Sequence, residues 1–180
     1  MTQFDFALLA YTLVPVTEEQ IFDLNDALID ATGDDFVMTA TGKCLIIDFY
    51  RESISYSEAV LSAIKQVQQV NNIKVKSVDA GQYVGLSDAA ELSSMSRSAL
   101  SKYSKGERGD GTFPTPFLRA KGKVPLYEWA EIAQWLEKNG LVEKGIAENA
   151  TFTAMINTAL SFNTEELEQV AKMERELHLA

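Results

Sequence analysis

The chain has 180 residues, 46% apolar and 23% charged, with a formal net charge of −10, a composition typical of a globular protein of one or two domains. It contains no apolar run near the roughly 20 residues that cross a bilayer, and its start includes Asp5 and lacks the basic leader of a secretion signal. With only one cysteine, Cys44, and one histidine, His178, it excludes an internal disulfide and disfavours a zinc site. We therefore expect a cytoplasmic protein without a metal or other cofactor.

Residues 1–82 predict an α+β domain with the element order β-α-β-β-α-β. The first helix is expected to follow Thr17, with Gln20 at the capping-box spacing, and the second to follow Ser55 or Ser57. Segments rich in β-branched and aromatic residues predict strands at 4–14, 36–42, 43–52 and 73–81. This order is that of the ferredoxin-like fold, with two helices on one face of a four-stranded antiparallel sheet. Such a fold indicates no particular chemistry.

Two features of this domain are candidate functional sites. Cys44 lies in the apolar segment KCLIIDFY, which predicts a buried strand, so we expect the thiol to pack inertly rather than to form a catalytic pair with His178. Asp30, Asp34 and Asp35 lack the spacing of a calcium-binding EF-hand loop, so we expect a helix end and a polar turn.

A basic segment follows in this acidic chain. Between residues 96 and 125, seven basic and two acidic residues give a charge of +5, whereas the nine basic and 24 acidic residues elsewhere give −15. A local basic surface can dock on phosphates within a Debye length of about 8–10 Å, even when the whole protein is acidic. A solvated basic turn is the simpler alternative, and the local pattern has to decide between them.

The pattern at 86–106 favours a helix-turn-helix. Ser87 is expected to cap a first helix over 86–95 that packs Ala89, Ala90 and Leu92 inward, and Ser96 a second helix over 96–106. The second helix has an apolar stripe of Ala99, Leu100 and Tyr103 and a polar, basic opposite face. A helix of this kind fits a DNA major groove, which is about 12 Å wide.

The following residues predict a wing and a closing helix. A glycine- and proline-rich loop, GERGDGTFPTP, leads into FLRAKGKVPLYEW, which fits two short strands around Lys121–Gly122. Residues 127–140 predict an amphipathic helix. Its inward residues are expected to be Trp129, Ile132, Ala133, Trp135 and Leu136.

Residues 84–138 resemble the winged helix-turn-helix of the MerR superfamily, in particular its excisionase or AlpA-like branch. The resemblance rests on VGLSDAAELSSMSRSALSKY, FPTPFLRAKGKVPLY and EWAEIAQWL. It implies binding of double-stranded DNA through the second helix and the wing. The residues that it assigns to DNA are Ser96, Arg97, Ser98, Ser101, Lys102 and Lys105 on the helix, and Arg119, Lys121 and Lys123 on the wing.

Enzymatic chemistry has little support in the sequence. GERGDGT lacks the GK[ST] ending of a phosphate-binding loop, and no serine or carboxylate pair has an evident general base nearby in sequence. The RGD tripeptide at 108–110 matches a cell-adhesion motif, and we attribute this match to chance because we expect a cytoplasmic protein. We therefore expect a protein that is not an enzyme.

Residues 141–180 predict a helical extension. An apolar helix at 150–162 and an acidic helix opening at Thr164 are expected to form a hairpin, which either dimerises, captures a partner or packs on the N-terminal domain. The predicted domains are thus 1–82, 83–140 and 141–180.

Two functional hypotheses follow. The first is a dimeric, possibly autoregulatory transcriptional regulator that binds double-stranded DNA. The alternative is an antitoxin-like interaction protein, whose acidic N- or C-terminal regions neutralise a basic partner protein.

Overall fold

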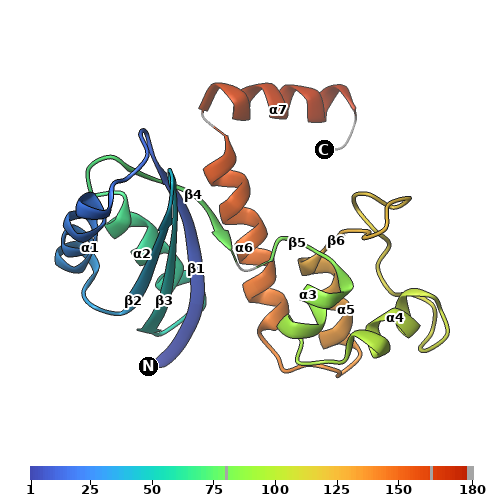
Figure 1. Ribbon diagram of the computed structural model, residues 1–180. Helices are drawn as coiled ribbons and strands as arrows, with labels where there is room; N and C mark the ends of the chain where they lie inside the picture. Colours follow the sequence, from blue (N-terminus) through green and yellow to red (C-terminus); the bar gives the residue numbers. More distant parts are fainter. Residues whose placement is uncertain (80, 163, 178–180) are drawn as a thin grey trace. The chain divides into compact units, whose positions relative to one another are not determined.

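The computed structural model describes residues 1–79, 81–162 and 164–177 (Figure 1), so His178 lies outside the described residues. Backbone contacts divide the chain into two compact units. Unit 1 comprises Met1–Val78 with Met155–Ala180, and unit 2 comprises Asp79–Ala154. The predicted α+β class is confirmed, whereas the three-domain division stays a prediction.

Unit 1 contains a four-stranded sheet with the strand order β2-β3-β1-β4 (Figure 1). The central strand β3 pairs antiparallel with both β1 and β2. The strands are β1 (Thr2–Thr12), β2 (Phe36–Thr41), β3 (Cys44–Ser53) and β4 (Ile73–Asp79), and the helices between them are α1 (Glu18–Thr32) and α2 (Tyr56–Val67). The predicted β-α-β-β-α-β order is therefore present, with strand ends that differ from the prediction by up to two residues.

Strict alternation along β3 builds the core and corrects one expectation. Leu45, Ile47 and Phe49 are buried, whereas Cys44 is exposed. Because successive side chains of a strand point to opposite faces, burying the odd-numbered residues leaves the thiol on the other face. The expectation of a buried Cys44 was wrong, although the strand itself was predicted correctly.

The two helices of unit 1 start at the predicted caps but are buried to very different extents. Thr17 and Gln20 form the predicted capping box, and Ser55, rather than Ser57, caps α2. Six residues of α2 are buried, whereas in α1 only Leu28 is. Helix α1 therefore covers the sheet loosely, while α2 supplies most of the helical part of the core.

A buried arginine ties the end of α1 to the sheet and to α2. The Arg51 side chain is 8% exposed, and its Nε and Nη2 donate to the Asp35 carboxylate at 2.6 and 3.0 Å. Its Nη1 donates to Ser62 and Gln66. Asp35 is thus engaged by a cation of the chain, in agreement with the structural role expected for the turn.

Unit 2 packs short elements around an aromatic core. They are β5 (Tyr83–Val84), α3 (Leu86–Leu92), α4 (Arg97–Ser104), β6 (Tyr127–Glu128) and α5 (Trp129–Lys138). All five predicted inward residues of α5 are buried. The strands β5 and β6 pair antiparallel, so the start and the end of the helix-turn-helix region are joined.

Helix α6 (Ile146–Ser161) contributes residues to both units, and α7 (Thr164–Glu176) follows it. Asn157 of α6 is 6% exposed and binds the backbone of Val78: the Val78 N–H donates to Oδ1 at 2.7 Å, and Nδ2 donates to the Val78 carbonyl at 3.0 Å. Because Asn163 between α6 and α7 lies outside the described residues, the expected hairpin stays a prediction.

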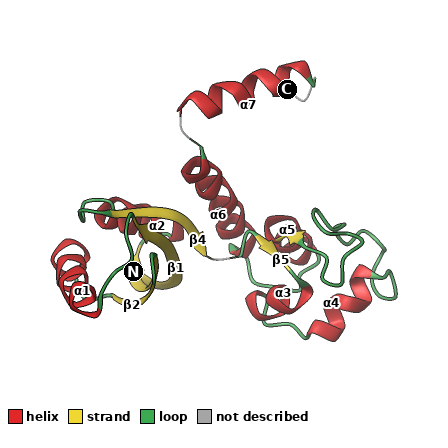
Figure 2. Cartoon of the chain, turned by 45° about the horizontal axis from the view of Figure 1, so that its top comes forward, coloured by secondary structure: helices red, strands yellow, loops and turns green. Residues whose placement is uncertain are grey.

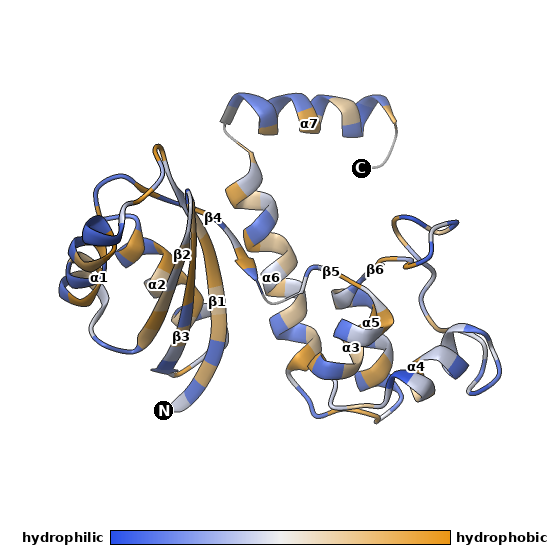
Figure 3. Cartoon of the chain, in the orientation of Figure 1, coloured by the Kyte–Doolittle hydropathy of each residue, from blue (hydrophilic) through white to orange (hydrophobic). Residues whose placement is uncertain are grey.

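The described side chains of α7 are exposed except for Val170, which is half-buried. Figure 3 shows a mainly hydrophilic helix with isolated hydrophobic bands. Leu167 and Met173 of this helix are exposed. None of the described helices is long and apolar enough to cross a bilayer.

Candidate nucleic-acid interface

The N-cap of helix α3 lies two residues earlier than predicted. Gly85, not Ser87, is the N-cap, and its N–H donates to the Asp88 carboxylate at 2.9 Å. With this start, Ala89, Ala90 and Ser93 are buried, whereas Leu92 is 39% exposed. Leu92 is the last residue of α3 and, although it lies three residues after the buried Ala89, its side chain is exposed. The expectation that Leu92 packs inward was therefore wrong.

Helix α4 has the predicted two faces. The Ser96 hydroxyl caps it by accepting from the Ala99 N–H at 3.1 Å, and Leu100 and Tyr103 are buried. The residues of the opposite face that were assigned to DNA are Arg97, Ser98, Lys102 and Lys105, which are exposed, and Ser101, which is half-buried. Since the Ser96 hydroxyl accepts from the backbone, its first role is to start the helix.

The loop after α4 is fixed to the core by a chain of hydrogen bonds. The Thr112 hydroxyl and N–H both donate to the Asp110 carboxylate, at 2.6 and 3.0 Å, and Trp135 Nε1 donates to the Thr112 hydroxyl oxygen at 2.9 Å. The hydrogen bonds from Thr112 lower the pKa of Asp110. The Arg108 guanidinium lies over the Tyr103 ring, 5.0 Å from its centroid. The RGD tripeptide therefore has a structural part in shaping this loop.

The predicted two-stranded wing is reduced to a single bridge. Leu118 and Leu126 pair antiparallel, with N–H to carbonyl distances of 3.1 and 2.9 Å. Between them the chain turns, with Arg119 at a φ of 54° and the Gly122 N–H donating to the Arg119 carbonyl at 2.7 Å. The expectation of two strands was wrong, because the chain makes turns and bends from 120 to 124 instead of continuing the pairing. Figure 2 shows the connection that follows α4 as loop.

The three predicted basic residues of the wing region, Arg119, Lys121 and Lys123, are all exposed. No ion pair engages them or the basic residues of α4 within the described part of the chain. Their charges are therefore directed to solvent and available to an anionic partner.

A hollow of about 230 Å³ brings α3, α4 and the wing region together. Its lining includes Arg97 from the first turn of α4, Lys123 from the wing region and Asp88 of α3. Gly85 permits this approach: a Cβ there would lie 3.3 Å from Cγ1 of Val124. The two cations can act on one phosphate-bearing surface, while the Asp88 carboxylate in the same lining opposes an anion.

The sequence did not predict an exposed aromatic pair beside this surface. Tyr83 of β5 and Phe117 stack with ring centroids 5.5 Å apart, and they are 41% and 57% exposed. Strand β5 has only two residues, so its pairing with β6 gives no alternating pattern long enough to detect. The sequence signal that could have indicated this pair is the second phenylalanine of FPTPF, which is Phe117.

Comparison with known proteins gives no relative from which a role could be transferred: no family model, curated protein or solved structure matches this chain. The functional argument therefore rests on the geometry and charge of the described residues.

Proposed function

We propose that the protein is a double-stranded DNA-binding transcriptional regulator that is not an enzyme. The observation that carries the proposal is the convergence of Arg97 and Lys123 on one hollow, although 25 residues separate them in the sequence. The exposed basic face of α4 continues this positive surface. A fixed arrangement of unpaired cations on a helix and a loop fits a duplex, which presents phosphates on both sides of its major groove.

In this proposal α4 enters the major groove and the wing region contacts the adjacent backbone. Arg97 in the first turn is placed to read a base edge, and a bidentate arginine–guanine contact contributes about 1–3 kcal/mol of discrimination. Lys121 and Lys123 contact phosphates, which fix the register on the duplex without reading sequence.

The proposal also includes a fold for each of the two units. Unit 2, over residues 84–138, is a winged helix-turn-helix of the MerR or AlpA-like kind with a shortened wing. Unit 1 contains a ferredoxin-like domain, which the β-α-β-β-α-β order supports. One short recognition helix covers one half-site, so the regulator acts as a homodimer on a two-fold symmetric operator, with the exposed α7 as a contact between copies.

The test is enrichment of fragmented genomic DNA on the purified full-length protein, followed by sequencing. We expect a palindromic site to be enriched by the wild type and by Lys65→Ala, which removes an exposed lysine from α2 of unit 1, outside the proposed surface. Arg97→Ala should lose this sequence preference. Equal enrichment by Arg97→Ala would overturn the assignment of α4 as the recognition helix.

A second candidate function, neutralisation of a basic protein in the manner of an antitoxin, is supported by α1. This helix has five acidic residues and no basic one, and Phe22 on it is 73% exposed. Co-purification with the product of a neighbouring gene, lost in Phe22→Ser, would support this function. Retention of the partner by Phe22→Ser would exclude α1 as its binding surface.

A further inference from the structure

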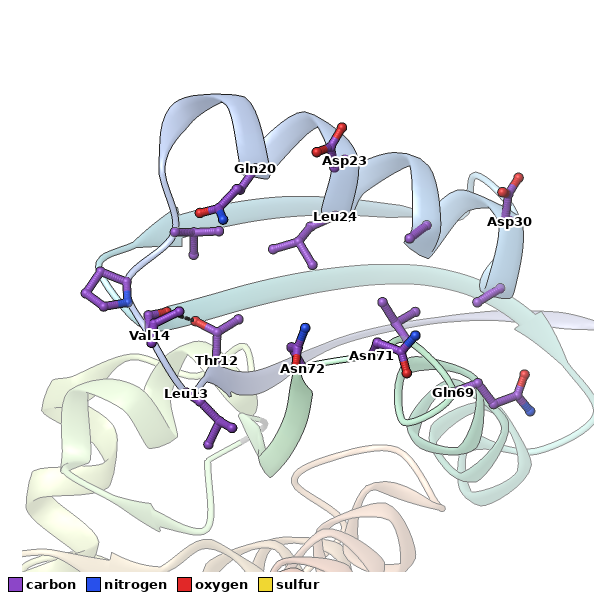
Figure 4. Close-up of a pocket in the computed structure, with 15 residues that line it drawn as sticks. Thr12, Leu13, Val14, Gln20, Asp23, Leu24, Asp30, Gln69, Asn71 and Asn72 are labelled. Carbon is purple, nitrogen blue, oxygen red and sulfur yellow. Dashed lines mark hydrogen bonds between the residues drawn. The ribbon is translucent and has the colours of Figure 1, made fainter.

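Unit 1 contains a cavity at one end of its sheet that DNA binding does not use. It has a volume of about 760 Å³ and lies between α1, the β1–α1 loop at 12–16 and the turn at 69–72 (Figure 4). This volume is within the range of about 300–1,000 Å³ that small-molecule sites occupy.

The cavity arises from the loose packing of α1. Ala27 and Ala31, one helical turn apart, line it with short side chains, and the buried Val70 also belongs to its lining. Figure 4 shows the Leu24 side chain and the Asn72 amide extending into the space between α1 and the turn. A close-packed interior would fill this space with larger side chains, so the small residues keep it open.

The lining combines apolar walls with free amides. Leu13, Val14, Pro15, Leu24 and Val70 are among its apolar residues. Gln69, Asn71 and Asn72 also line it; all three are exposed, and their side-chain amides form no hydrogen bond within the described part of the chain. Amide oxygens of this kind can accept hydrogen bonds from a ligand whose apolar body contacts the walls.

The electrostatic field at the cavity favours a positive ligand. No lysine or arginine lines it, whereas Asp23 and Asp30 do. In Figure 4 both carboxylates lie on the outer side of α1 and point away from the space, so they act through the field and not by contact. Over a Debye length of about 8–10 Å this field attracts cations and repels anions.

We propose that this cavity binds a small organic amine with an apolar body, which gives the protein an effector site in unit 1. The walls around Leu24 and Val70 hold the apolar part, the amides of Asn71 and Asn72 accept from the ammonium group, and the carboxylates of α1 set the charge preference. The inference is independent of the DNA-binding proposal.

Three indoles of equal body and different charge test the proposal: tryptamine, the alcohol tryptophol, and indole-3-acetate. Calorimetric titration of the full-length protein should give the order tryptamine, tryptophol, indole-3-acetate from tightest to weakest. In ¹⁵N-resolved spectra of the wild type, tryptamine should shift the amide resonances of Ala27, Asn71 and Asn72. Equal binding of the three compounds, or shifts confined to other residues, would overturn the proposal, as would no binding at millimolar concentration.

Two variants test separately whether tryptamine occupies the cavity and whether the carboxylates of α1 contribute to its binding. Ala27→Phe fills the cavity and should abolish tryptamine binding. The double variant Asp23→Asn with Asp30→Asn should weaken tryptamine by about four-fold, at roughly two-fold for each distant carboxylate, and leave tryptophol unchanged. Unchanged tryptamine binding in a folded Ala27→Phe protein would place the ligand elsewhere.

Arg97→Ala separates this site from the DNA surface. This variant should bind tryptamine like the wild type even where its DNA binding is lost. If tryptamine binding fails while DNA binding persists, only the effector site is refuted; the reverse result refutes only the DNA-binding proposal.

Discussion

Replacement of Asn157 by alanine should destabilise unit 1, because this side chain satisfies both backbone groups of Val78. The two hydrogen bonds are 2.7 and 3.0 Å long, and both residues are buried, at 6% and 2% exposed. Leaving one buried donor or acceptor unsatisfied costs about 1–3 kcal/mol. Alanine also has a higher helix propensity than asparagine by about 0.5 kcal/mol. Because two groups of Val78 lose their partner, the expected net loss is about 1.5–5.5 kcal/mol of the free energy of unfolding.

Asn149→Ala is the matched control, since Asn149 is a half-buried residue of the same helix whose side chain makes no hydrogen bond within the described residues. Urea unfolding followed by circular dichroism gives the stability, and hydrogen exchange at the Val78 amide gives the local effect. Asn157→Ala should lower the midpoint and the protection of Val78, while Asn149→Ala should leave both unchanged or raise the midpoint slightly. Equal behaviour of the two variants would refute the reasoning.

Further predictions concern the α4–wing loop and the buried arginine. The folded-state pKa of Asp110 is lowered. Its contribution to the stability of the folded protein is therefore present above the unfolded pKa and is lost as the pH falls through the folded pKa. Asp110→Asn should flatten the acid side of the profile of urea midpoint against pH, and an unchanged profile would contradict this. Thr112→Val removes the acceptor of Trp135 Nε1 and should cost about 1 kcal/mol, with a shift of tryptophan fluorescence; a wild-type spectrum and midpoint would speak against the bond. Asp35→Ala leaves the buried Arg51 with two neutral hydrogen-bond partners, Ser62 and Gln66. Since the Asp35 side chain is 28% exposed, we expect a loss of about 1–3 kcal/mol of stability, below the value for a fully buried pair. A loss of the same size in Asp34→Ala would show that the pair is not its cause.

The sequence predicted the elements that depend on local signals. The capping box at Thr17, the cap at Ser96 and the hairpin around Gly42 are encoded within a few residues, and each is present. The buried residues of α5 follow from a clear 3.6-residue period. The basic face of α4 was predictable for the same reason.

The expectations that failed depend on a precise phase or on distant contacts. Whether Cys44 is buried depends on which of two strand faces is covered, and the exposure of Leu92 depends on which tertiary contacts cover the last turn of α3. The pairing of Leu118 with Leu126 persists for one bridge only, because the intervening chain folds through Arg119 at a positive φ. The convergence of Arg97 with Lys123, and the cavity beside Ala27, arise from tertiary packing that no single segment encodes.

The most direct test of the central claim is the salt dependence of binding to a fluorescent 30-base-pair duplex of random sequence, measured by anisotropy. For the wild type, the logarithm of the binding constant should fall linearly with the logarithm of salt concentration, with a slope of about −0.9 for each phosphate contacted. Lys123→Ala should reduce the magnitude of this slope by about one unit, while Lys65→Ala, on α2 of unit 1, leaves it unchanged. Absence of duplex binding at low salt, or identical slopes for all three proteins, would contradict the assignment of α4 and the wing region as a DNA-binding surface.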